Sequence, residues 1–328
     1  MRKSHVPFFM EVERQEQQRM DERLLQIARC DTIADVKECM KVLLGLYVWF
    51  NKILAANIKG TARDSDSVVM MHMFYSKGAS FLQLLDGFPF VDEGKEIGRI
   101  IEPTVLYSLA RDIYEALCAY ELVFVLPKTE EQKMIAYNIF YISSMKERSN
   151  YKHQTEKSRK IASEEAEDIE NAKQQIEATV YYQQLPDKDK QFLQAKMNSP
   201  HPVYRLLYEE HAVVPVKWED AYTTFGMAEE MFGNIYAYLS LYAHPTAVAV
   251  TRFREMFTDQ QNGIERKVSF AGKLVVQMLS VFVIDFCRQH DFAREVYHQS
   301  DEMTKCMADF INIIARGPEY AFYLHMEE

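Results

Sequence analysis

The chain has 328 residues, of which 48% are hydrophobic and 26% charged, as in a globular protein with a sizeable core. Its formal net charge of −10 argues against broad non-specific binding to nucleic acid, because that binding depends on lysine and arginine side chains meeting phosphates. The cysteines are widely spread and none forms a C-x-x-C pair, which predicts reduced thiols in a cytoplasmic protein.

The chain is expected to divide into a polar lead-in, residues 1–30, and a single all-helical domain, residues 31–328. The apolar patch Val6–Met10 is too short for a signal peptide. The longest apolar stretch, Leu274–Ile284, is interrupted by polar residues and is too short to span a bilayer, which needs about 20 apolar residues. We therefore predict a protein without membrane partners, in which this stretch is a buried core helix.

Two helices are predicted first along the chain. Apolar residues recur at three- and four-residue spacing from Asp35 to Asn57, and a second helix runs from Asp64 to Leu85, with Gly87 at its end. The segment Gly87–Gly98 is expected to be a loop that packs onto the body, since no alternating pattern of useful length predicts strands. The loop's large apolar residues are Phe88, Phe90, Val91 and Ile97.

The segment Thr104–Leu126 predicts the central helix of the fold. Pro103 is tolerated in its first turn, and from Ile113 onward the segment is apolar almost all round. A helix that is apolar on every side is normally buried. The expected fold is therefore all-α, an irregular multi-helix bundle around residues 104–126.

A long helical region follows, because the chain has no glycine and no proline between Pro127 and Pro186. Thr129 and Gln132 form a capping box at its start. We expect residues 129–183 to form one long bent helix, an arm or a hairpin, with the break near Ser149–Tyr151. The remaining helices are predicted at Ala228–Ala243, Ala247–Phe257, Val268–Gln289 and Phe292–Ala315.

Charged residues on the apolar central helix are the first candidate site. Arg111 and Glu115 are four residues apart and share a helix face, with Asp112 beside them. A charge in a core must be paired or hydrogen-bonded. The group is therefore either a structural ion pair or the floor of a polar pocket in which Arg111 holds an anion and Glu115 orients it.

A second polar stripe consists of Tyr236, Ser240 and His244, spaced four and four on one predicted helix. Pro245 follows, so the helix is expected to end near His244, where a helix C-terminus favours the protonated imidazole. The stripe is either a capping histidine beside a satisfied hydroxyl or one wall of a pocket that faces Arg111. Serine-type catalysis is not expected, because no nucleophile elbow accompanies Ser240.

An arginine followed closely by a histidine is typical of HEPN ribonucleases, and the chain contains two such pairs, Arg148/His153 and Arg205/His211. Chance alone gives about as many matches in a chain of this composition. Arg148/His153 lies in the more basic helical stretch and is the catalytic pair under this alternative, a ribonuclease-like toxin or defence component.

The sequence gives little support for a bound metal or cofactor. No His-x-x-x-His pair and no Gly-rich phosphate loop occurs, so neither a metal nor a cofactor is expected. A third alternative is a helical scaffold that forms a homodimer through the narrow apolar seam Ile161–Val180.

Two short motifs stand out together, Arg-Asp-x-x-Glu and Tyr-x-x-x-Ser-x-x-x-His-Pro. Their residues here are Arg111, Asp112, Glu115, Tyr236, Ser240, His244 and Pro245. They resemble a group of bacterial all-helical proteins known only as a domain of unknown function, over roughly residues 40–290. The resemblance implies an all-α fold, no established activity, and two polar stripes that meet in space. The leading hypothesis is a binding protein with a buried polar pocket for a small anion or a protein partner.

Overall fold

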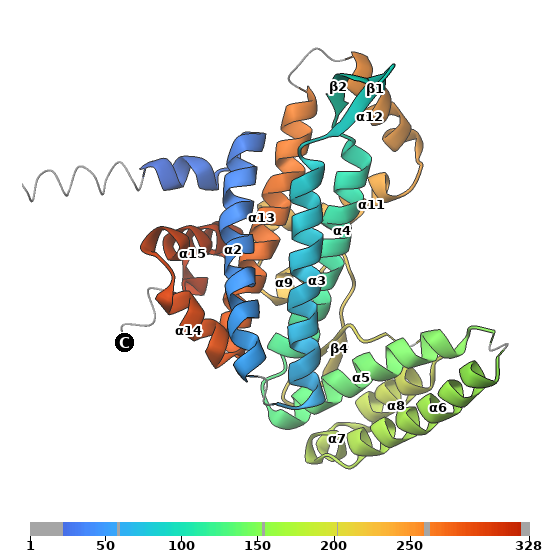
Figure 1. Ribbon diagram of the computed structural model, residues 1–328. Coiled ribbons are helices and arrows are strands. Elements are labelled where there is room, and N and C mark those ends of the chain that lie inside the picture. The colour runs from blue at the N-terminus through green and yellow to red at the C-terminus, as the bar shows by residue number, and fades with distance from the viewer. Residues whose placement is uncertain (1–21, 58–59, 153–154, 202, 259–262, 323–328) are drawn as a thin grey trace, which may run out of the picture. The chain divides into compact units, whose positions relative to one another are not determined.

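The protein is described by a computed structural model over residues 22–57, 60–152, 155–201, 203–258 and 263–322. Helices dominate these residues, and two small antiparallel strand pairs are the only sheets among them (Figure 1). The predicted all-α multi-helix bundle is confirmed. The chain divides into two compact units, the first made of Met1–Lys59, Met71–Tyr114 and Gly226–Glu328, the second of Gly60–Met70 and Glu115–Phe225.

Two helices contribute to both units, α3 (Ala62–Leu84) and α4 (Pro103–Tyr120). The chain therefore passes between the units within these two helices as well as outside them, and the single domain over residues 31–328 stays a prediction. Most of the predicted lead-in, residues 1–21, lies outside the described residues. Its last part is helical from residue 22 to residue 28.

The first unit is organised around α13 (Gly263–Gln289), which packs against α2 (Ile33–Asn57), α14 (Asp291–Gln299) and α15 (Glu302–Arg316) (Figure 1). Among the described residues α13 alone is long and apolar enough to cross a membrane, but 89% of its apolar window is buried. It is the buried core helix that the sequence predicts around Leu274–Ile284.

A buried ion pair joins α13 to α15. The side chains of Asp285 and Arg316 are each 2% exposed, and two guanidinium nitrogens of Arg316 lie 2.5 and 3.1 Å from the Asp285 carboxylate. Arg288 adds a third contact to the same carboxylate at 2.8 Å. Charges are tolerated at such a site only when they are paired in this way.

The predicted central helix consists of α4 and a π-helical turn, Glu121–Val125. Its residues from Leu117 to Phe124 are all buried. The capping box at the start of α5 (Glu130–Ser149) is confirmed, because the Thr129 hydroxyl accepts from the Gln132 backbone while the Gln132 side chain accepts from the Thr129 backbone.

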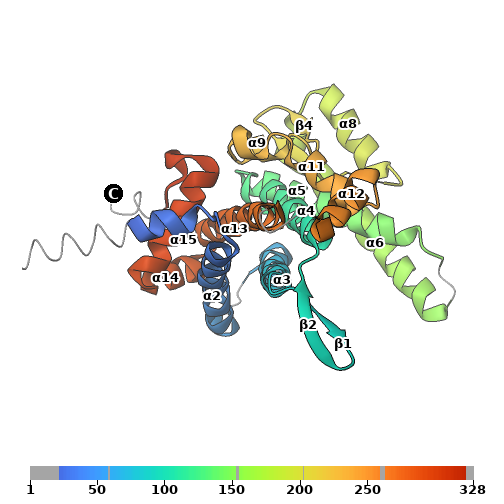
Figure 2. The same ribbon diagram turned by 90° about the horizontal axis from the view of Figure 1, so that it is seen from above.

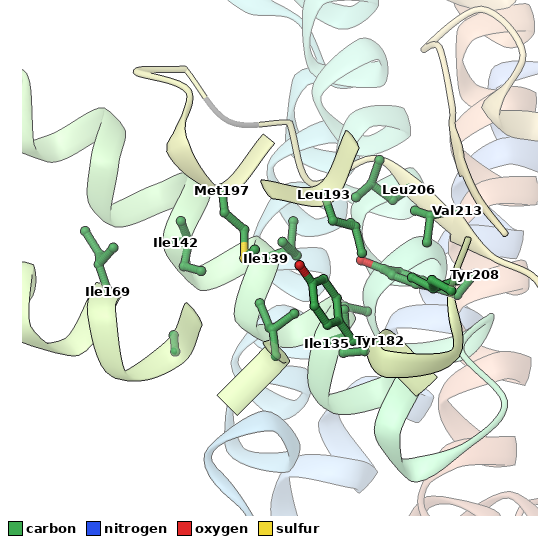
Figure 3. Close-up of a cluster of buried hydrophobic side chains, with 14 residues drawn as sticks. Ile135, Ile139, Ile142, Ile169, Tyr182, Leu193, Met197, Leu206, Tyr208 and Val213 are labelled. Carbon is green, nitrogen blue, oxygen red and sulfur yellow. The ribbon is translucent and has the colours of Figure 1, made fainter. Parts of the chain in front are cut away.

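The long run after Pro127 is a helical hairpin. The structure breaks it where the sequence predicts, and α6 (Glu156–Glu177) packs back against α5. Apolar residues of both helices form the core of the second unit together with α7 (Val180–Gln184), α8 (Asp187–Asn198) and the strands β3 (Leu206–Tyr208) and β4 (Val213–Pro215) (Figure 3). The short helix α9 (Ala221–Thr224) ends this unit.

The segment after Gly87 differs from its prediction. It forms an antiparallel hairpin of β1 (Phe88–Asp92) and β2 (Lys95–Ile100), whose turn places Gly94 at a φ of +78°. The expected packing of its apolar residues onto the body is wrong, because all four are more than half exposed. In Figure 2 the hairpin reaches out beyond α3. Pro89 and Gly98, which both disfavour strands, mask the pattern in the sequence.

The first unit is completed by α10 (Glu229–Phe232), α11 (Ile235–Ala243), α12 (Ala247–Thr258) and a short 3-10 turn, Pro318–Tyr320. The helix predicted over Ala228–Ala243 is thus two helices with a break at Gly233–Asn234. That break opens a cavity, described below.

Candidate functional site

Helices α4 and α11 carry the polar residues that the sequence singles out. Early residues of one helix meet late residues of the other, since Tyr107 stacks on Tyr242 with ring centroids 4.3 Å apart while Arg111 meets Tyr236. The two helices therefore run antiparallel along this contact, and both lie in the first unit over residues 103–114 and 235–243.

Arg111 and Tyr236 are brought together as the sequence predicts. A guanidinium nitrogen of Arg111 donates to the Tyr236 hydroxyl at 3.0 Å, and the guanidinium carbon lies 5.0 Å from the centre of the same ring. Tyr114 packs beside it, with its ring centroid 6.2 Å from that of Tyr236. The arrangement combines a hydrogen bond with a cation–π contact and holds Arg111 half-buried.

Asp112 and Glu115 are the other predicted residues on α4. Asp112 is exposed and forms an ion pair with Lys77. Glu115 follows Arg111 by one helical turn but belongs to the second unit. The role of Glu115 in orienting an anion stays a prediction.

Ser240 and His244 are the other two predicted residues of the α11 stripe. Ser240 donates to the Tyr236 carbonyl at 2.6 Å, a bond within its own helix. His244 is the C-cap residue of α11 and is exposed, so the prediction that it lies inside the bundle is wrong. Eight residues separate it from Tyr236, a rise of about 12 Å along a helix, and Pro245 ends the helix at this point.

His244 instead lines a pocket of about 300 Å³. The walls come from the start of α4 and from the junction of α11 with α12, and they comprise Thr104, Val105, Ser108, Tyr242, Ala243, His244, Pro245 and Ala249. The Ser108 hydroxyl donates to the Thr104 carbonyl at 2.8 Å. Its oxygen therefore remains able to accept a hydrogen bond from a ligand.

Three tyrosines, named here the tyrosine cluster, fill the space between α4 and α11: Tyr107, Tyr238 and Tyr242. The ring of Tyr238 meets those of Tyr107 and Tyr242 edge-on at 5.6 and 5.4 Å. Burial raises the pKa of Tyr107 well above its usual range and, together with the Tyr238 hydroxyl, raises the pKa of Tyr242 to about 12. These hydroxyls stay neutral at physiological pH.

A second cavity, of about 450 Å³, lies at the other end of α11. It is lined by Glu229, Glu230, Met231, Gly233, Asn234, Ile235, Tyr238 and Phe270. The sequence analysis missed this cavity because it treats residues 228–243 as one helix. The signal was present, since Gly233 and Asn234 are a common place for a helix to break.

The pair predicted for the ribonuclease alternative is described only in part. Arg148 forms an ion pair with the buried carboxylate of Glu165 across the α5–α6 hairpin, while His153 lies outside the described residues. In the other pair, the Arg205 guanidinium carbon lies 4.3 Å from the centre of the Trp218 ring. Both arginines thus have structural partners, and the ribonuclease reading stays a prediction.

The seam predicted for a homodimer is used mostly within the chain. Ile169, Ala172 and Ile176 are buried in the core of the second unit, whereas Ile161 and Val180 are 38% and 58% exposed. Within the described part of the chain, no group of three or more histidine, cysteine or acidic residues is placed to hold a metal ion.

No family model, curated protein or solved structure matches this chain. The resemblance to a bacterial domain of unknown function therefore remains a prediction.

Proposed function

We propose that this chain is a cytoplasmic small-molecule-binding protein that holds a small hydroxylated anion in the His244 pocket. One observation carries the proposal: Ser108 of α4 and both Tyr242 and His244 of α11 line one pocket of about 300 Å³. Ligand pockets have volumes of about 300–1,000 Å³ and a few convergent polar groups. This volume suits a ligand of modest size.

The chemistry of the lining selects the ligand class. A protonated His244 supplies a positive charge and a donor for a carboxylate. The Ser108 oxygen, whose own hydrogen is engaged with the Thr104 carbonyl, can accept from a ligand hydroxyl. A small hydroxy acid satisfies both groups at once.

An acidic residue, Glu102, precedes the pocket residues Thr104 and Val105 in the chain. Its carboxylate accepts from the backbone of Thr104 at 3.0 Å and of Val105 at 2.6 Å. These bonds place its charge at the N-terminus of α4, where the helix dipole and free N–H groups stabilise it.

Calorimetric titration with glycerate tests the proposal, because its carboxylate is ionised at both about pH 5.5 and about pH 8. Binding should be about tenfold tighter at the lower pH, because a protonated imidazole attracts the carboxylate and a neutral one does not. Glycerol and acetate, which each lack one of the two recognised groups, should bind more weakly.

The decisive comparison is His244→Gln against His298→Gln, which changes another exposed histidine of the same unit. The first variant should lose the pH dependence, and the second should keep it. Equal pH dependence in both variants, or no glycerate binding at either pH, would overturn the assignment.

A further inference from the structure

The cavity of about 450 Å³ is built where α10 ends and α11 begins. The Gly233 N–H donates to the Glu229 carbonyl at 2.8 Å and closes α10, and Asn234 starts α11 in a non-helical conformation. The break brings Glu229 and Glu230 of α10 and Tyr238 of α11 into the lining of one cavity. Phe270 of α13 completes the wall.

The aromatic wall of this cavity is held in place. The rings of Tyr238 and Phe270 meet edge to face, with centroids 5.9 Å apart and planes at 83°. Behind Tyr238 lie the other two members of the tyrosine cluster, and Tyr107 is anchored by a hydrogen bond from its hydroxyl to the Lys267 carbonyl at 2.9 Å. A wall fixed in this way presents π-electron density without having to order itself when a ligand arrives.

The charge of the cavity is negative. Glu229 and Glu230 are both exposed, and neither forms an ion pair with any residue that the structure describes. No lysine, arginine or histidine occurs among the residues that line the cavity, and Asn234 adds a neutral amide. Two carboxylates beside two aromatic rings favour a positively charged guest, since both the charges and the ring quadrupoles attract a cation.

We propose that this cavity binds a small organic cation, an amine or quaternary ammonium on an apolar body. The cationic group would lie between the carboxylates and the Tyr238 ring, with the apolar body against Phe270. The carboxylates belong to adjacent residues and bring no third acidic, histidine or cysteine ligand from the described residues, so an organic cation fits better than a metal ion. This proposal does not depend on the His244 pocket, which has different lining residues.

The first test compares benzyltrimethylammonium with benzyl alcohol, which has the ring but no charge, by calorimetric titration of the full chain at low salt. The cation should bind and should weaken about tenfold between low and physiological salt, because exposed carboxylates are screened. Benzyl alcohol that binds as tightly as the cation, or a cation that does not bind, would overturn the proposal.

Variants separate the contribution of the carboxylates to binding from that of the Tyr238 ring. The double change Glu229→Gln and Glu230→Gln should weaken the cation about tenfold, whereas Glu265→Gln with Glu295→Gln, an equal charge change on exposed residues of the same unit, should leave it within about twofold. Tyr238→Phe keeps the ring and should retain binding, and Tyr238→Leu should lose it. If Tyr238→Leu does not fold, the double variant Glu229→Gln and Glu230→Gln still tests the proposal. A loss of cation affinity no larger than that of its control variant would contradict the site.

Discussion

Two apolar regions of the first unit, α13 and the β1–β2 hairpin, differ in how far their side chains are buried. α13 is buried around its whole circumference over most of its length, whereas every residue of β1 is exposed and β2 is exposed except at its last residue. A helix satisfies its own backbone hydrogen bonds and can be covered on all sides by other helices. A two-stranded hairpin has two open faces, and no third strand is described beside it. Hydrophobic residues are buried only where neighbouring elements supply a covering surface.

The hairpin is fixed at its base rather than by a core. Arg99 donates to the carbonyls of Asp86 at 3.0 Å and Gly87 at 3.3 Å, and it forms an ion pair with Glu96 at 2.9 Å. Pro89 cannot donate from the β1 edge, which hinders pairing with other strands. α13 and the hairpin should therefore respond very differently to substitution. The chain has two tryptophans, so changing Trp218 of the second unit to Phe leaves Trp49 as the fluorescent probe for unfolding of the first unit.

Asp285→Ala is expected to have the largest effect. It leaves the guanidinium of Arg316 buried without its carboxylate partner, which costs about 3–5 kcal/mol of unfolding free energy. Urea unfolding measures the loss. As a control, Asp291→Ala removes an ion pair whose carboxylate is 94% exposed and should cost less than about 1 kcal/mol. Similar losses in the two variants would contradict the assigned burial.

Gly272→Ala should cost about 1–3 kcal/mol, because overpacking forces neighbouring groups to shift. A Cβ at Gly272 would lie 2.9 Å from Cγ2 of Val36 and closer still to its Cγ1. Gly45→Ala in α2 is the matched control, since its new methyl group meets nothing within 4 Å and alanine favours the helix by up to about 1 kcal/mol. Thermal unfolding should move in opposite directions for the two variants, and a stabilising Gly272→Ala would refute the close α2–α13 packing.

Alkaline pH should weaken the packing between α4 and α11. Unfolded tyrosines lose their protons near pH 10, whereas the pKa of Tyr242 is raised to about 12 and that of Tyr107 is raised further by burial. Above about pH 10 the unfolded chain therefore binds fewer protons than the native one, and stability falls as pH rises. Absorbance at the tyrosinate band should show these tyrosines ionising later than exposed ones. Complete ionisation near pH 10 with the fold intact would contradict their burial.

Phe88→Ser with Phe90→Ser should have the smallest effect, under about 0.5 kcal/mol, because both side chains are more than half exposed. Binding of a hydrophobic dye should decrease. Phe282→Ala in α13, where the ring is fully buried, provides the contrast and should cost about 3–5 kcal/mol. A hairpin variant that destabilises the unit comparably would show that the hairpin packs onto the body after all.

One contact within the candidate site was predicted from the sequence. Spacing alone placed Tyr236, Ser240 and His244 on one helix, and the polar interruptions of an apolar segment pointed to Arg111, whose contact with Tyr236 the structure shows. Spacing could not show that His244 ends its helix in an exposed position, because exposure depends on what else packs there. It also could not show that Phe270 of α13, far along the chain, closes the acidic cavity at the break between α10 and α11.

Most of the helices, and the break near Ser149–Tyr151 in the long helical region, were determined by the sequence itself. Their signals, apolar spacing, a capping box and the absence of breakers, act between residues only a few positions apart. Tertiary structure alone decided which apolar segments are covered, which carboxylate meets Arg316, and how the tyrosine cluster separates two pockets. Those outcomes depend on the free energy of contacts between segments far apart in the chain. The spacing of residues within one segment cannot predict that free energy.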